Sequence, residues 1–464
     1  MEKYLEQITT REKALKLNLQ PTIYGVFAEV GAGQEVVNQF FNAGAASGTI
    51  AKSISAYDMT ISDSIYGETR KYVSRDRVES MLEVEYEMLK NSLSTRSPQK
   101  HFFAFANTIE TTNFQQTNQG QGWIGIRYQL TPNGPPVTCI IHIVLQTNDV
   151  VEQRKIIGEL GVNLIYGAFE YSHHNELFVE NLKQNINGDY LEVNYIELNG
   201  NQFDSKKSIR LSLQLVKSGL TKMIMLGKNF EVLQPSNSLY KKDVVLVRGR
   251  FRPPTKVTEE MFLRSQNQLA NNNKLSEHGM MAVAEITFRC FQDQTELSVD
   301  DFLQRAELIV GLGYPLVITN FTFHHELIHF MRNSFNLNSL SIVLGMDNLR
   351  KVISNKQKYT SEEGLLELLQ AISSYNGKIM VFPELNQKSE LSVLEDLNLD
   401  PAVLHLFRYL QSKGKIEEIE GVNKELLSIR SDQVLNAIVN NKDSWRSDVP
   451  QQIVSILDYQ AQLK

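Results

Sequence analysis

The stretch LVITNFTFHHELIHFMRNSFNLNSLSIVL, residues 316–344, contains the pattern that decides the fold. Its two ends are short apolar runs of the kind that form buried strands, and residues 324–334 between them have the apolar spacing of a helix. A strand, a helix and a second strand in this order are typical of a parallel sheet, because parallel strands need a crossover connection. The sequence therefore predicts a βαβ unit here.

The same alternation continues on both sides of this stretch. Further strands are predicted at 283–291, 378–382 and 415–420, and further helices at 298–312 and 361–374. From about residue 400 onward the pattern is mainly helical. This half of the chain is therefore predicted to be a regular, doubly wound parallel layer that ends in a helical region.

The first half of the chain is more mixed. Turn signals at Asn118-Gln119-Gly120 and Pro132-Asn133-Gly134 separate strand-like runs with little helix between them, which predicts antiparallel hairpins. Helices are predicted at 150–159 and 176–184. The predicted strands are 22–30, 49–56, 101–109, 123–130, 137–145, 163–171, 190–197, 223–226 and 244–247.

The fold class that follows is α/β: a mixed α+β N-terminal half, a more regular parallel second half and a helical C-terminal tail. We expect three regions, at 1–250, 251–395 and 396–464. The boundary near 250 is suggested by Arg252-Pro253-Pro254, which leads into a polar helix and then into a run of asparagines at 271–273.

Composition excludes several classes of protein. The 464 residues carry 47 basic and 53 acidic side chains, so the formal net charge is -6, and a broad nucleic-acid-binding face is not expected. The only cysteines, Cys139 and Cys290, lie far apart in apolar runs, which predicts buried thiols in a reducing compartment. No apolar segment resembles a signal peptide or a membrane span, so we expect a cytoplasmic protein without a membrane partner.

A first candidate site is the glycine turn after the strand at 22–30. Gly31 and Gly33 follow an apolar strand and precede a helix-compatible run, so backbone amides of the turn could bind an anion. Asp58, after the next strand, could accept hydrogen bonds from ribose hydroxyls. The third glycine of a dinucleotide-binding turn is missing, and a turn needed only for packing is the alternative.

A second candidate follows the strand at 244–247. There Gly249, Phe251, Pro253 and Thr255 resemble the opening motif of the nucleotidyltransferase superfamily. Val257 and Thr258 stand where that motif has a glycine and a histidine, and the resemblance assigns that histidine to stabilising the transferred phosphate. Arg248, Arg250, Arg252 and Lys256 could still bind an anionic ligand. The alternative is a solvated basic loop.

A third candidate is His325-Glu326-Leu327-Ile328-His329, which fits the His-Glu-x-x-His pattern of zinc hydrolases. His325 and His329 would be ligands on one helix face, and Glu326 would polarise a zinc-bound water. A third protein ligand is required, and the later Glu362, Glu363 and Glu367 are the nearest choices. The alternative is an amphipathic helix with a polar face.

Several stretches together resemble an uncharacterised bacterial cytosolic family. They are residues 24–36, 55–60, 161–169, 247–253, 341–345 and 445–450. Members of that family carry two conflicting names, nicotinate-nucleotide adenylyltransferase and TonB-dependent receptor. We expect the second name to be wrong, because the sequence shows neither a signal peptide nor a long run of alternating membrane strands.

The sequence as a whole favours a cytoplasmic protein that binds a nucleotide-like or phosphate-bearing ligand, as a degenerate relative of nicotinate-nucleotide adenylyltransferases. Whether the protein is an enzyme stays open, and no catalytic residue or cofactor is assigned. One alternative is a non-catalytic, homo-oligomeric structural or regulatory protein, with the chain itself as partner. The other is the zinc-dependent hydrolase.

Overall fold

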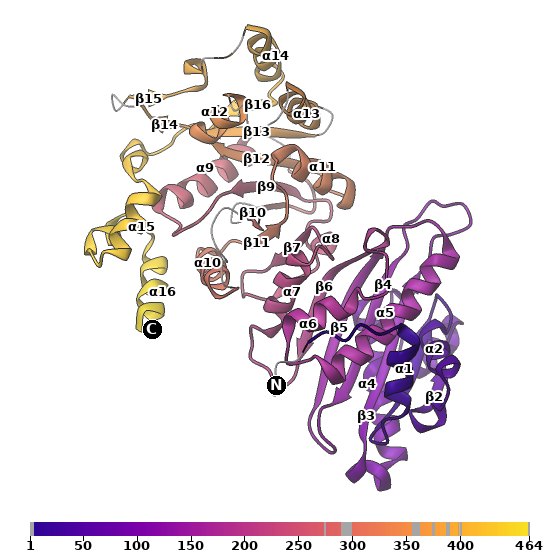
Figure 1. Ribbon diagram of the computed structural model, residues 1–464. Coiled ribbons are helices and arrows are strands. Elements are labelled where there is room, and N and C mark those ends of the chain that lie inside the picture. Colours follow the sequence, from indigo (N-terminus) through magenta and orange to yellow (C-terminus); the bar gives the residue numbers. More distant parts are fainter. Residues whose placement is uncertain are drawn as a thin grey trace. The chain divides into compact units, whose positions relative to one another are not determined.

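The computed structural model describes residues 4–272, 275–288, 299–354, 362–373, 376–386, 390–397, 399 and 401–462. The chain divides into two compact units, Met1–Ile224 and Met225–Lys464. Both combine helices with a sheet, which confirms the α/β class (Figure 1). Among the helices of the described ranges, none combines the length and apolar character that crossing a membrane requires.

The first unit is built on a six-stranded mixed sheet with the order β2-β1-β3-β4-β5-β6. β1 pairs in parallel with β2 and β3, whereas β3, β4, β5 and β6 pair antiparallel, as the hairpin signals predicted. The strands are β1 (Ile23–Val30), β2 (Ile50–Ile54), β3 (His101–Glu110), β4 (Gln121–Gln129), β5 (Pro136–Leu145) and β6 (Leu191–Asn199).

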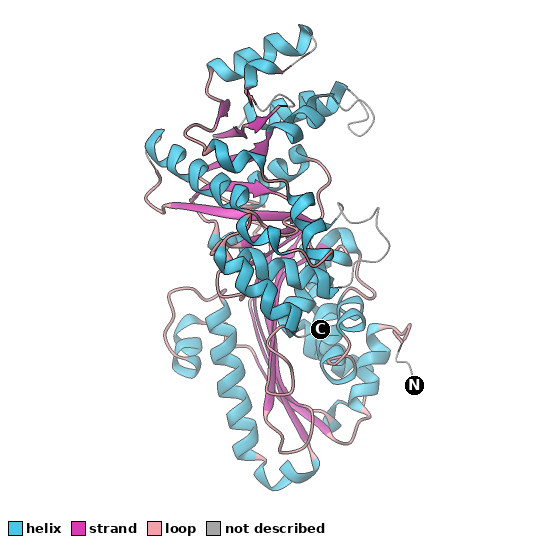
Figure 2. Cartoon of the chain, turned by 90° about the vertical axis from the view of Figure 1, so that its left-hand side faces the viewer, coloured by secondary structure: helices cyan, strands magenta, loops and turns pink. Residues whose placement is uncertain are grey.

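Helices cover both faces of this sheet, and Figure 2 shows them on either side of the strands. α4 packs on β1, β3 and β4, and α3 packs against α4. The main core lies on the other face and includes Phe27, whose ring lies 5.1 Å from that of Phe40 and 5.5 Å from that of Phe103. The helices are α1 (Thr10–Asn18), α2 (Glu35–Ala43), α3 (Met59–Tyr66), α4 (Arg75–Ser92), α5 (Val150–Glu170), α6 (Asn175–Leu182) and α7 (Lys207–Lys217).

One strand prediction in this unit is wrong. Residues 163–171 were expected to form a strand, but all of them except Tyr171 belong to helix α5. The helix is buried around most of its circumference, from Ile156 to Ala168, so its apolar residues form a nearly continuous run. Such a run hides the helical period and cannot be distinguished from a buried strand by spacing alone.

The second unit is built on an eight-stranded sheet with the order β16-β13-β12-β9-β10-β11-β7-β8. Six neighbouring strands, from β16 to β11, are parallel. The strands are β7 (Met223–Leu226), β8 (Val232–Leu233), β9 (Asp243–Arg248), β10 (Met280–Thr287), β11 (Leu316–Thr319), β12 (Ser339–Gly345), β13 (Gly377–Phe382) and β16 (Ile416–Glu418), with a separate hairpin of β14 (Glu384–Leu385) and β15 (Leu391–Ser392).

Helices connect these strands as the alternating pattern predicted. α11 packs against α13, and α10 packs against α16. The helices of this unit are α8 (Pro235–Ser238), α9 (Lys256–Asn272), α10 (Val299–Gly311), α11 (His324–Ser334), α12 (Met346–Ser354), α13 (Glu362–Ser373), α14 (Pro401–Ser412), α15 (Ser431–Val439) and α16 (Gln451–Gln462).

This division differs from the domain boundaries expected at 250 and 395. β9 was expected to end the first domain, yet it lies in the middle of the second sheet, between β10 and β12. Its hydrogen-bonding partners are strands that follow it in the chain, so a strand pattern read in order along the sequence placed it on the wrong side of the boundary. β16 likewise joins this sheet from within the C-terminal region.

Candidate anion-binding site at the carboxyl edge of the second sheet

The order in which the parallel strands of the second unit are added to the sheet reverses at one point. Numbered in chain order, β9, β10, β11, β12, β13 and β16 lie across the sheet as 6-5-4-1-2-3. The connections therefore lead outward in opposite directions from β9 and β12. In open parallel sheets of this kind, ligands bind outside the carboxyl ends of the strands where the order reverses. The loop from β9 to α9, residues 249–255, leaves the sheet at this position.

A buried ion pair fixes the ends of the strands at this edge. Glu285 of β10 is fully buried; its carboxylate forms an ion pair with Arg248 Nε at 3.0 Å and accepts a hydrogen bond from Thr319 Oγ1 at 2.5 Å. Burial raises the pKa of Glu285, and the positive charge of Arg248 opposes that rise. Arg248 Nη2 also donates to the carbonyl of Phe321 at 2.5 Å. Three neighbouring strands are thus tied together by one arginine and one glutamate.

One donor of this arginine is left over. Arg248 Nη1 is buried and has no hydrogen-bond partner within the described ranges. A buried donor without an acceptor costs about 1–3 kcal/mol. An anion bound beside it would satisfy this atom.

The loop after β9 has a defined conformation. The amide of Gly249 donates to the carbonyl of Glu285 at 3.1 Å, which extends the pairing of β9 with β10. Phe251 has a positive φ of 46°, and its buried ring lies 3.0 Å from where a Cβ on Gly249 would stand. A side chain at position 249 would press on this ring, which would have to shift by a few tenths of an ångström.

The loop ends at helix α9, whose first turn is partly capped by the protein itself. Thr255 is buried, and its amide donates to Thr258 Oγ1 at 3.2 Å. The amide of Lys256 donates to the carbonyl of Asp448 at 2.9 Å. Thr258, which stands where the nucleotidyltransferase motif has a histidine, therefore serves here as a capping residue of the helix.

Arginine side chains give this edge a positive excess. Arg250 and Arg252 are exposed on the loop, and Arg252 lies 4.0 Å from Asp301. Arg305 is buried beside the same Asp301 at 2.6 Å. Burial lowers the pKa of Arg305, and the charges of Arg252 and Arg250 lower it further, so the three arginines lie within electrostatic reach of one another. Within the described ranges, two of these arginines, together with Arg248, are paired with two carboxylates, Asp301 and Glu285.

A histidine adds a neutral polar ring beside this cluster. His324 begins helix α11, directly after β11. Burial lowers the pKa of His324 to about 3, and the nearby charge of Arg248 acts in the same direction. The imidazole is therefore neutral at physiological pH, so it can offer one donor and one acceptor but no charge.

The His-Glu-x-x-His pattern lies on the same helix, where Glu326 and His325 make contacts that stabilise the start of the helix. Oε2 of Glu326 accepts a hydrogen bond from the amide of Phe323 at 3.0 Å, which caps the start of α11. The ring of His325 stacks on that of Phe323 at 5.4 Å. Within the described ranges, His, Cys, Asp and Glu side chains form no group of three that could hold a metal, His329 included. The side chains of Glu362, Glu363 and Glu367 lie outside the described residues.

The glycine turn of the first unit is occupied by a side chain of the protein. Glu29, fully buried at the end of β1, accepts from the amides of Val36 and Val37 at 3.1 and 2.9 Å and from Asn107 Nδ2 at 3.0 Å. Burial raises the pKa of Glu29 to about 7 in spite of these donors. The amides that the sequence offered to a ligand at the start of α2 therefore already bind a carboxylate.

The other predicted residues of that turn also have local partners. A Cβ on Gly31 would stand 1.9 Å from the carbonyl oxygen of Ile109, so the chain passes β3 too closely for a side chain. Gly33 has a positive φ of 91°. Asp58 caps helix α3 by accepting from the amide of Ile61 at 3.1 Å. These residues therefore have structural roles, in agreement with the alternative that the turn is needed for packing.

The structure thus brings together Gly249, Arg250, Arg252 and Thr255 at one sheet edge, where Arg248, Glu285, Thr319, Asp301 and Arg305 join them. Sequence analysis missed the last four of these. Glu285 and Thr319 stand out only as polar residues inside apolar runs, a signal that could have been noticed. Asp301 and Arg305 lie on a helix with ordinary i,i+4 spacing, which gives no sign of a site.

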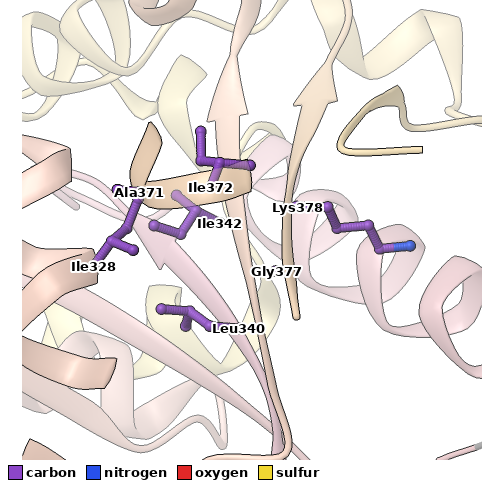
Figure 3. Close-up of a pocket in the computed structure, with 7 residues that line it drawn as sticks. All are labelled: Ile328, Leu340, Ile342, Ala371, Ile372, Gly377 and Lys378. Atoms are coloured by element: carbon purple, nitrogen blue, oxygen red, sulfur yellow. The ribbon is translucent and has the colours of Figure 1, made fainter. Parts of the chain in front are cut away.

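A small cavity lies elsewhere in this unit. Figure 3 shows its lining, with Leu340 and Ile342 on β12, Ala371 and Ile372 on α13, and Ile328 on α11. Its volume is ≈ 10 Å³, about the size of one water molecule. It lies toward the amino ends of β12 and β13, and it is too small for a ligand.

Comparison with known proteins finds only distant structural likeness. No family model and no curated protein matches the chain. Solved structures similar to part of it include a competence-damaged protein (CinA) superfamily protein from Enterobacter cloacae, at 9% identity and a TM-score of 0.27. The competence/damage inducible protein CihA from Agrobacterium tumefaciens has 13% identity and a TM-score of 0.24. The competence damage-inducible protein A (ComA) from Klebsiella pneumoniae has 9% identity and a TM-score of 0.27.

These three matches each cover 36% of this chain and 97–99% of the other. TM-scores of this size carry no argument about function.

Proposed function

We propose that the second unit binds a nucleotide-like or phosphate-bearing anion in the cytoplasm, at the carboxyl edge of its sheet beside the loop of residues 249–255. The observation that carries the proposal is the excess of arginine at the carboxyl ends of β9, β10 and β11, next to the point where the strand order reverses. Arg250 and Arg252 extend from the loop, and the Arg248–Glu285 pair holds the strand ends beneath it. Arginine suits phosphate because its guanidinium can donate two parallel hydrogen bonds.

The strand order supports the resemblance to nucleotidyltransferases. The matching residues, Gly249, Phe251, Pro253 and Thr255, follow the first parallel strand of a doubly wound sheet, where the first crossover loop contacts phosphates in dinucleotide-binding folds. Thr258 has a capping hydroxyl in place of the histidine of that motif. We therefore propose a degenerate relative that binds a nucleotide without transferring its phosphate.

Titration calorimetry with ATP and with inorganic pyrophosphate tests the binding proposal. We expect both probes to bind, and the Arg250→Glu/Arg252→Glu variant to bind at least tenfold more weakly, because each lost charge-assisted hydrogen bond contributes about 1.5–3 kcal/mol. Arg408→Glu, an exposed arginine on α14 of the same unit, is the control and should bind normally. Equal binding by wild type and double variant would place the ligand elsewhere.

A second measurement tests the absence of transfer. Pyrophosphate release from ATP in the presence of nicotinate mononucleotide should not exceed the rate without protein. Release that requires Arg250 and Arg252 would show that the chain is an active transferase and that another group replaces the missing histidine.

The sequence alternative of a self-assembling protein is a second proposal. It is favoured by a different surface, the β2 edge of the first unit, where large apolar side chains are exposed.

A further inference from the structure

Strand β2 forms an open edge of the sheet in the first unit. It is the last strand in the order β2-β1-β3-β4-β5-β6, and Figure 1 shows it at the margin of that unit, beside α1 and α2. Its pairing with β1 is regular at Lys52, Ser53 and Ile54, and the one register shift lies nearer its amino end. An edge strand presents backbone donors and acceptors that another strand can pair with.

Large apolar side chains are exposed on the elements that lead into and out of this strand. Tyr57, Met59 and Ile61 follow it and are 71%, 61% and 55% exposed. Leu19 and Phe41, at the ends of α1 and α2, are 64% and 53% exposed. Single exposed apolar residues need no explanation, but a group of this kind marks an interaction surface.

Hydrogen bonds place these residues close to the strand. Asn18 Nδ2 donates to the carbonyls of Phe40 and Gly44 at 2.9 and 2.6 Å, and Thr49 Oγ1 donates to the carbonyl of Leu17 at 3.3 Å. The ends of α1 and α2 are thereby held at the amino end of β2. Tyr57 lies three residues beyond its carboxyl end, so apolar side chains flank both ends of the edge.

The charge that could protect this edge is directed elsewhere. Lys52 is the only charged residue of β2, and lysines on edge strands commonly prevent unwanted pairing. Its Nζ lies 2.6 Å from Oε2 of the buried Glu85 and 3.6 Å from Met88 Sδ, both on α4. The ammonium group is therefore paired with a carboxylate on α4 of the same chain, and this leaves the strand edge without a repelling charge.

From this arrangement we infer that the β2 edge is a dimer interface between two copies of this chain, with the two β2 strands paired antiparallel about a two-fold axis. A two-fold axis presents the same strand and the same apolar side chains to one another, so the surface complements itself. The six-stranded sheet then continues from one copy into the other.

The available area suits this occupant. Burying the five apolar side chains would remove on the order of 600 Å² of surface per copy, since large side chains of this kind bury roughly 150–250 Å² when fully covered. Val84 and Met88 on α4, both partly exposed, and the backbone of β2 add to this. The total approaches the roughly 800 Å² per partner of a standard stable interface.

Sedimentation equilibrium of the full chain tests the inference. Wild type should have twice the mass of one chain, whereas Met59→Asp/Ile61→Asp should raise the dimer dissociation constant at least tenfold. Aspartate is compatible with folding at these positions, because both lie in the first turn of α3, where negative charge is favourable. The control Phe114→Asp/Val151→Asp removes two apolar side chains of the same unit that are even more exposed, and it should remain dimeric.

Hydrogen exchange gives an independent readout in the wild-type chain. Those amides between Ala51 and Ile54 that point away from β1 should become more protected as protein concentration rises, because pairing with a second β2 strand uses them. A monomeric wild type, a variant that stays dimeric, or protection that does not change with concentration would each overturn the inference. A dimer that uses another surface would appear as the second of these outcomes.

Discussion

Glu29, at the end of β1, accepts a hydrogen bond at 2.9 Å from the backbone amide of Val37 in the first turn of α2. This contact means that the protein supplies its own anion to the helix start where a ligand was expected. A carboxylate is well suited to this position, because the first amides of a helix have no partners within the helix and carry partial positive charge.

Replacing Glu29 should therefore expose the anion preference of this turn. Glu29→Ala leaves the amides of Val36 and Val37 and the side chain of Asn107 without an acceptor, so we expect the free energy of unfolding to fall by about 3 kcal/mol or more. Urea unfolding measures this loss, and added formate should restore part of it by binding in the vacated position.

The control for this experiment is Glu35→Ala. Glu35 lies at the start of the same helix, but its carboxylate contacts Arg154 at the surface. It should lose little stability and show no response to formate. A Glu29→Ala variant that formate does not stabilise would contradict the assignment of the turn as an anion site.

Two glycines of the same turn should respond differently to substitution. Gly31→Ala places a Cβ against the carbonyl oxygen of Ile109 at a positive φ of 99°, so the backbone must move and a loss of about 3 kcal/mol or more is expected. The added Cβ of Gly33→Ala meets the ends of two side chains, Arg154 at 3.3 Å and Glu35 at 3.6 Å, so its cost should be about 1 kcal/mol. Thermal unfolding of both variants, with Gly44→Ala as a positive-φ position in open space, compares these effects; equal losses would be evidence against the close approach to β3.

Lys13 should make stability depend on pH. This fully buried lysine donates to Asn163 Oδ1 at 2.6 Å and to Asn181 Oδ1 at 2.7 Å, and burial lowers its pKa to about 7. The unfolded chain, in which the pKa is near 10.4, binds more protons between these two values, so stability should rise as pH increases from about 7 to about 10.

The Lys13→Met variant tests the origin of this dependence. It cannot titrate at this position, so the rise attributable to Lys13 should disappear from its unfolding free energy measured across the same pH range. Lys16→Met, at a neighbouring exposed lysine paired with Glu6, should keep the rise. If Lys13→Met and wild type show the same slope, another group is responsible.

The Arg248–Glu285 pair should behave as one unit. Glu285→Gln leaves a mostly buried guanidinium without its counter-charge, and we expect a loss of roughly 3 kcal/mol in unfolding free energy. Arg248→Met should cost a similar amount, but the double variant should cost at least 1 kcal/mol less than the two losses added together. Urea unfolding of the four proteins in this cycle measures the difference, and simple additivity would mean that the pair does not hold the strand ends together.

Glu326 offers a test of the zinc interpretation. If its role is the cap on the amide of Phe323, Glu326→Ala should lower stability by about 1 kcal/mol and leave the metal content of the purified protein unchanged. We also expect a chelator to leave the melting temperature of wild type unchanged. The opposite result would be stoichiometric zinc in the wild type that is lost in the His325→Ala variant. It would support the zinc-hydrolase interpretation, with a third ligand outside the described residues.

The spacing of apolar residues predicted most strands and helices of the second unit, because each of them is defined by its own short stretch of sequence. Strands such as 316–320 and helices such as 324–334 are short and clearly bounded, so apolar spacing identifies them. The hairpins of β3, β4 and β5 were predicted from their turn residues in the same way. The first half of helix α5 was predicted, but its second half was assigned to a strand, because burial around most of its circumference there removes the polar face that spacing needs.

Partners distant in the chain were decided only by the tertiary structure. The sequence determined that Gly31, Gly249 and the histidines lie next to strand ends and helix starts. Only the folded chain shows that Glu29 fills the first turn of α2, that Glu326 caps α11, and that Glu285 binds both Arg248 and Thr319 across β9, β10 and β11. Glycine, glutamate and arginine have the same chemistry in a cap, a packed turn or a ligand site, and which of these they form depends on groups that other strands bring within hydrogen-bonding distance.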